Sequence, residues 1–96
     1  MTDRIDTKTP GLTIDFIGGN CPVQAEGTIN GSEFYFRARG QHWTMGIGGS
    51  DVILKPAWYR ERPYGDGPFD AGWMTEQEAL NFIEDSAADY TSGKEA

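Results

Sequence analysis

The chain has few of the features that mark secreted, membrane-spanning or disulfide-bonded proteins. It contains a single cysteine, Cys21, so no internal disulfide bond can form, which suits a reducing compartment. It has no apolar run near the ~18 residues that a membrane-spanning helix needs. Residues 1–10 are polar and lack the apolar core of a signal peptide. We therefore expect a cytoplasmic protein that does not enter the membrane.

Positive charge is also scarce. The 96 residues include 8 Lys or Arg against 15 Asp or Glu, which gives a net charge of −7. Binding to DNA or RNA requires basic side chains that neutralise phosphates, so direct nucleic-acid binding is not expected. A basic protein, including one that itself binds nucleic acid through a basic groove, is the favoured partner.

Catalytic and metal-binding patterns are missing as well. The only Cys and His, Cys21 and His42, are predicted to point to opposite faces of a sheet, because Cys21 shares its parity with core position Val23 and His42 shares its parity with Thr44. No serine lies in a nucleophile-elbow sequence, and no Lys-Ser or Lys-Thr follows the glycines at 46–49. The acids Asp66 and Asp70 have no calcium-loop spacing. We expect no enzyme activity, no metal and no cofactor.

What the chain does contain is a stretch, residues 23–47, that specifies its own strand pairing. Asn30-Gly31 lies between two alternating segments and predicts a two-residue hairpin turn, and Gly40-Gln41 predicts a second one. The first turn places Phe36 opposite Ala25, and the second places Phe36 opposite Met45. Both registers put Phe34, Phe36 and Ala38 on one face, and a slip of one residue would turn all of them to solvent.

The rest of the chain extends this pattern into one domain. Residues 1–11 are expected to be a flexible leader and residues 12–96 a single α+β domain. Strands are predicted at 12–17, 23–29, 33–39, 42–47 and, as a short apolar run, 52–54. Leu12, Ile14 and Phe16 are expected on one side of the first strand. Residues 55–74 are rich in Pro, Gly and aromatics and are expected to form an ordered loop over the sheet.

One helix is predicted from Thr75 to about Tyr90. Thr75 and Glu78 have the capping-box spacing, in which each side chain bonds to the other residue's backbone amide. Apolar residues recur at three- and four-residue steps and predict a stripe that faces the core; they are Ala79, Leu80, Ile83, Ala87 and Tyr90. The predicted architecture is an antiparallel meander of four or five strands with this helix packed on one face.

Two surfaces are candidates for binding a partner. The segment from Pro63 to Gly93 has seven acids and no Lys or Arg. Six of these acids form the predicted acidic surface: Asp66, Asp70, Glu78, Glu84, Asp85 and Asp89. The second candidate is the outer face of the sheet, where Tyr, Arg and His have the composition of an interface hot spot. Its predicted contact residues are Tyr35, Arg37, Arg39 and His42. For both surfaces the alternative is an ordinary solvated surface.

Two segments, FYFRARGQHWTMGIGG at 34–49 and AGWMTEQEA at 71–79, resemble small proteins of bacterial phages and prophages. The small, acidic α+β character of the chain resembles phage-encoded anti-CRISPR proteins, a class without a diagnostic motif. This resemblance implies a stoichiometric inhibitor that binds a DNA-binding surveillance complex and blocks its access to DNA. The alternative is a cytosolic adaptor or homo-oligomeric module that docks through the Tyr/Arg sheet face.

Overall fold

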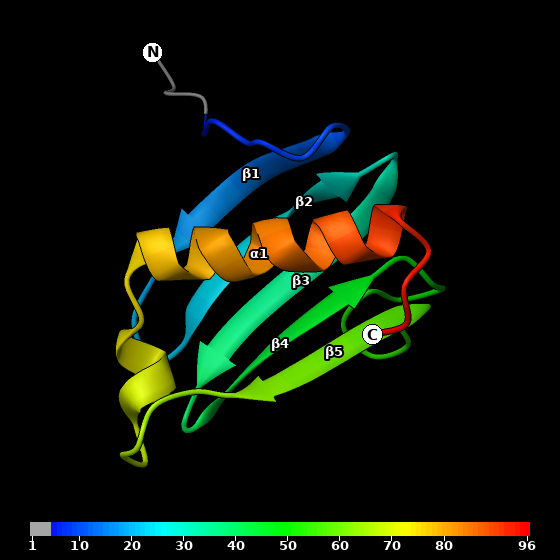
Figure 1. The fold of residues 1–96 in the computed structure, drawn as a ribbon. Coiled ribbons are helices and arrows are strands. Elements are labelled where there is room, and N and C mark those ends of the chain that lie inside the picture. Colours follow the sequence, from blue (N-terminus) through cyan, green and yellow to red (C-terminus); the bar gives the residue numbers. More distant parts are fainter. Residues whose placement is uncertain (1–4) are drawn as a thin grey trace.

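A five-stranded antiparallel sheet and one long helix make up the fold. The computed structural model describes residues 5–96. The strands follow one another in the sheet in chain order, and helix α1 crosses one face of the sheet (Figure 1). In chain order the elements are β1 (Leu12–Gly18), β2 (Val23–Ile29), β3 (Ser32–Arg39), β4 (His42–Ile47), β5 (Trp58–Pro63), the 3-10 helix η1 (Asp70–Trp73) and α1 (Glu76–Thr91). The predicted α+β meander with a C-terminal helix is confirmed.

Both predicted hairpin turns set the register as expected. Asn30 and Gly31 have φ of 50° and 84°, the two positive values that a type I′ turn requires. Ala25 pairs with Phe36, and Phe36 pairs with Met45. The central three strands therefore bury the side of the sheet that carries these residues.

The core lies between this side of the sheet and the helix. Phe34, Phe36, Met45 and Ile83 are buried with exposed fractions of 0–1%. The Phe36 ring stacks on Trp43 at a centroid distance of 5.6 Å, and Trp43 stacks on Phe82 of the helix at 4.8 Å. Aromatic stacking thus adds a directional contact between sheet and helix to the burial of apolar area.

The helix begins where its cap predicts. The Thr75 hydroxyl accepts a hydrogen bond from the Glu78 amide at 3.1 Å, and the Glu78 carboxylate accepts from the Thr75 amide at 3.0 Å. Ala79, Ile83 and Ala87 are fully buried against the sheet. The capping box and the apolar stripe are both confirmed.

The prediction of a strand at 52–54 is wrong, and the fifth strand lies later. The Asp51 carboxylate accepts from the amides of Ile53 and Leu54 at 2.9 and 3.0 Å, which curls this short run into a turn. Strand β5 instead lies inside the segment predicted to be a loop. The buried position of β5 is occupied by Arg60, so the sequence of this strand lacks the alternation of apolar and polar residues that indicates a strand.

Two side chains differ from their predicted orientation at the start of the sheet. A bulge between Ile14 and Phe16 shifts the register of β1, so Phe16 pairs with Glu26 and is 52% exposed, while Ile17 pairs with Ala25. Cys21 is exposed rather than buried. It lies in the turn before β2 with φ of 44°, so the strand parity that predicted a core position does not extend to it.

Candidate protein-binding surfaces

Most of the predicted acidic surface is engaged within the molecule. The Asp70 carboxylate accepts from the backbone amides of Asp66 and Gly67 at 2.9 and 2.8 Å. These two amide donors stabilise the charged form and lower the pKa of Asp70 below its usual value. Asp70 therefore closes the turn that leads from β5 to η1.

Glu78 is shared between the helix cap and an aromatic residue. Besides its capping role, its carboxylate accepts from the Tyr64 hydroxyl at 2.5 Å. The hydrogen bond to this carboxylate raises the pKa of Tyr64 to about 12, and the same bond lowers the pKa of Glu78. The pair ties the segment after β5 to the start of α1.

Glu84 holds the segment that precedes the sheet. Its carboxylate accepts from the amides of Lys8 and Thr9 at 2.5 and 3.0 Å and from the Thr9 hydroxyl at 2.6 Å. Ile5 is half-buried and packs against the core. Residues 5–9 therefore run along the helix, whereas residues 1–4 of the predicted leader lie outside the described residues.

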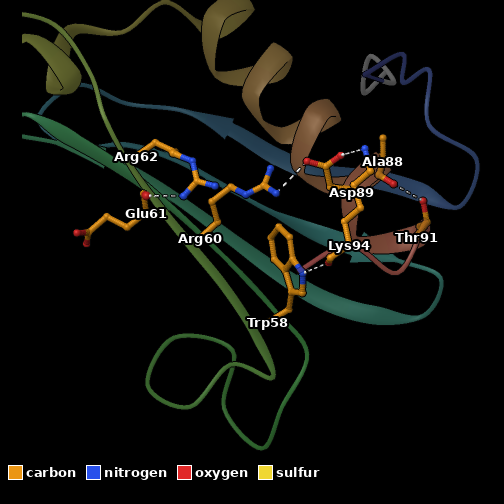
Figure 2. Close-up of polar contacts among 8 residues, drawn as sticks. All are labelled: Trp58, Arg60, Glu61, Arg62, Ala88, Asp89, Thr91 and Lys94. Atoms are coloured by element: carbon orange, nitrogen blue, oxygen red, sulfur yellow. Dashed lines mark hydrogen bonds and ion pairs between the residues drawn. The ribbon is translucent and has the colours of Figure 1, made fainter. Parts of the chain in front are cut away.

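Asp89 anchors the end of the helix to β5 (Figure 2). Its carboxylate forms an ion pair with Arg60 at 2.8 Å and a looser one with Lys94 at 3.6 Å. The Arg60 guanidinium also lies 4.8 Å over the ring of Trp58, whose indole N–H donates to the Lys94 carbonyl oxygen at 3.0 Å. The hydrogen bond from Arg60 lowers the pKa of Asp89. This cluster was not predicted from the sequence, because Arg60 and Asp89 are 29 residues apart.

The six acids therefore do not act as one uniform surface. Asp70, Glu78, Glu84 and Asp89 each accept hydrogen bonds that position a neighbouring segment. Only Asp66 and Asp85 are exposed and use no side-chain oxygen in a hydrogen bond to another residue of 5–96. These two are the acids available to a partner without cost to the fold.

The second candidate surface is brought together as predicted. Strand alternation places Tyr35, Arg37 and Arg39 on the side of the sheet that faces away from α1. Within residues 5–96 no helix covers this side, which we call the open face (Figure 1). His42 lies directly opposite Arg39, and the Tyr35 hydroxyl donates to the Gln24 side chain at 2.9 Å.

Sequence reasoning missed several other parts of the open face. Phe16 reaches it through the bulge, and Tyr59 reaches it from β5 with 49% of its surface exposed. The turn at 51–55 packs over one end of the face, where a Cβ on Gly46 would lie 2.7 Å from the Val52 carbonyl oxygen. Ile53 of this turn helps to line a pocket of about 320 Å³ together with Asp15, Glu26, Glu33 and Tyr35. The pocket sits at the acidic end of the face.

The backbone amide of Cys21 donates a hydrogen bond to the carbonyl oxygen of Gly72. Within residues 5–96, no hydrogen bond joins Cys21 and His42. No group of three or more His, Cys, Asp or Glu in these residues could hold a metal ion. In the same range, no helix combines the length and apolarity needed to cross a bilayer.

Comparison with known proteins adds no relative from which to transfer a role. No family model matches the chain, and neither the curated proteins nor the solved structures give a significant match. The functional conclusion therefore rests on the two surfaces.

Proposed function

We propose that the protein is a non-enzymatic protein-binding domain that docks through the open face. The observation that carries this proposal is the contrast between the two sides of one sheet. The helix side is packed and buried, while the open face presents Tyr59 and Arg37 to solvent and carries the half-buried Tyr35. Tyr and Arg supply much of the energy in protein interfaces because they offer large, partly apolar contact areas with polar ends.

Inhibition of a DNA-binding complex through the acidic surface is the other form of this proposal. The net charge of −7 supports it, because an acidic protein is attracted to a basic groove. The internal bonds of Glu84 and Asp89 support it less, since a carboxylate that holds its own fold is not free to pair with a partner. The open face is therefore the favoured contact.

A capture experiment separates the two surfaces. The immobilised protein is exposed to a lysate of the source cells, with and without nuclease, and bound proteins are identified. The variant Y35A/R37A alters the open face, and the variant D66K/D85K alters the two free acids without touching those that hold the fold. We expect the captured partner to be lost with Y35A/R37A and retained with D66K/D85K.

The opposite pattern contradicts the open-face proposal and favours the acidic surface. The dependence of binding on salt concentration is a second test. Binding that is driven by charge weakens steeply once exposed charges are screened beyond about 8–10 Å. Binding that survives physiological salt and D66K/D85K points to the aromatic part of the open face. Circular dichroism of each variant confirms that the fold is intact.

A further inference from the structure

The two ends of the middle strand carry outward-facing residues of opposite charge. Strand β3 is third of five in the sheet, and its outward residues are Glu33, Tyr35, Arg37 and Arg39. They are symmetric about Phe36: Tyr35 and Arg37 lie one residue away on either side, and Glu33 and Arg39 lie three residues away. If two copies of β3 face each other in opposite directions with Phe36 at the centre, the acidic Glu33 of one copy therefore lies opposite the basic Arg39 of the other.

The neighbouring strands extend this polarity across the face. Glu26 lies beside Tyr35, and Asp15 lies near it at the same pocket, so that end is acidic. Arg39 and His42 pair at the other end, next to the turn between β3 and β4. The open face thus has an acidic end and, apart from Glu61 on β5, a basic end, although the whole chain is strongly acidic.

We infer that the partner of the open face is a second copy of this chain, bound face to face around a two-fold axis. This inference rests on the proposed function, because it names the occupant of the same surface. The axis runs across the strands along the row of paired residues Ala25, Phe36 and Met45. Sheets packed face to face lie about 10 Å apart, a gap that Glu and Arg side chains can bridge from both sides.

This axis brings compatible residues of the two β3 strands together. Glu33 of one copy meets Arg39 of the other, and Tyr35 meets Arg37 in a cation–π geometry, each contact occurring twice. On β5, Tyr59 of each copy lies opposite Glu61 of the other, where the tyrosine hydroxyl can donate a hydrogen bond to the carboxylate. A two-fold axis parallel to the strands instead stacks Glu33 on Glu33 and Arg37 on Arg37, which like-charge repulsion disfavours.

The dimer can also accommodate the turn at 51–55 between the two sheets. It lies over Gly46 of its own β4 and exposes Ile53 and Leu54, at 58% and 78%. The axis sets Gly46 against Thr44 of the other copy, where a small side chain leaves room for the turn. Arg39 of the second copy reaches the acidic pocket, in which Ile53 contacts its aliphatic stem and Glu33 faces its guanidinium.

The size of the face predicts a weak dimer. Five strands about 4.8 Å apart and about six residues long make a face of roughly 24 by 20 Å. Two copies then bury on the order of 1,000 Å², near the lower limit for a specific interface. Association in the micromolar range is therefore expected, and it weakens as salt screens the paired charges.

Charge-reversal variants at Glu33 and Arg39 test the proposed dimer. Self-association of the full chain is measured by sedimentation equilibrium from about 1 µM to about 1 mM. The variants E33R and R39E each place like charges at both symmetric contacts, and each should weaken self-association by at least about tenfold. An equimolar mixture of E33R and R39E should associate again, because both contacts in the mixed dimer are then of opposite sign. The controls R62E and D85R change charge on the helix side and should dimerise like the natural protein.

Two results with the variants would overturn the inference: single variants that still dimerise, or a mixture that stays monomeric. A natural chain that is monomeric over the whole range also overturns it. In that case the proposed function still stands if Y35A/R37A loses a captured partner of different sequence, so the two failures are distinguishable.

Discussion

The two faces of strand β3 differ in almost every physical property although their residues alternate along one segment. Phe34, Phe36 and Ala38 are 0–1% exposed and pack under the helix, whereas Arg37 and Arg39 are exposed on the open face. Burial of apolar area stabilises the fold on the first face, and contacts with another protein are proposed for the second. Substitutions at neighbouring positions of β3 should therefore have separate effects: those on the buried face should lower the free energy of unfolding, and those on the open face should weaken binding.

The largest expected effect is on the buried face. Phe36→Ala removes a ring that stacks on Trp43 and lies fully inside the core. We expect a loss of about 3–5 kcal/mol in the free energy of unfolding, because the cavity adds to the lost burial. Urea unfolding followed by circular dichroism measures it. A loss below about 1 kcal/mol would contradict the packing of this face.

A smaller effect is expected where the helix that covers the buried face begins. Thr75→Ala removes the hydroxyl that accepts from the Glu78 amide. The free energy of unfolding should fall by about 1 kcal/mol, since an orphan amide at the helix start loses its partner. The control Thr75→Ser keeps the hydroxyl and should be close to neutral. Equal stability of the Ala and natural chains would show that the cap is not formed.

The Tyr64–Glu78 pair predicts a pH dependence on the helix side. The folded pKa of Tyr64, about 12, lies above its ordinary 10.0, so its stabilisation is full below pH 10 and is lost as pH rises toward 12. The pKa of Glu78 is lowered from 4.5, so its stabilisation is present above that value and is lost as pH falls below it. The melting temperature of the natural chain should fall at both limits.

Glu78→Gln tests the link between these two titrations. Without a charged acceptor, the pKa of Tyr64 should move down toward 10, which ultraviolet absorbance of tyrosinate records. Tyr64→Phe supplies the baseline for the other tyrosines. An unchanged alkaline titration in Glu78→Gln would show that this carboxylate does not hold the Tyr64 proton.

The smallest effect on stability is expected on the open face. Arg37→Ala should change the free energy of unfolding by less than about 0.5 kcal/mol, because the side chain is exposed and away from the core. Its neighbour Phe36→Ala is the matched contrast. A loss as large as that of Phe36→Ala would erase the distinction between the two faces, and unchanged partner binding would remove Arg37 from the proposed interface.

Residues 23–47 and the helix could be predicted because their signals are local. A type I′ turn needs positive φ at two adjacent positions, and Asn-Gly satisfies both, so the register follows from the turn. A capping box likewise involves only Thr75 and Glu78. From these elements the faces of Tyr35, Arg37 and Arg39 follow by alternation, which is why their placement on one side of the sheet could be predicted.

The tertiary structure alone decided three other features. Strand β5 buries Arg60, which pairs with Asp89, a residue 29 positions away, so the burial of Arg60 cannot be predicted from the neighbouring residues. The bulge that turns Phe16 outward depends on how β1 fits β2. The acids of residues 63–93 form one block in the sequence, yet four of the six predicted contact residues bond to separate parts of the fold. Local patterns thus determined the turns, the cap and the alternation, whereas charge pairing and edge-strand geometry depend on contacts between distant segments.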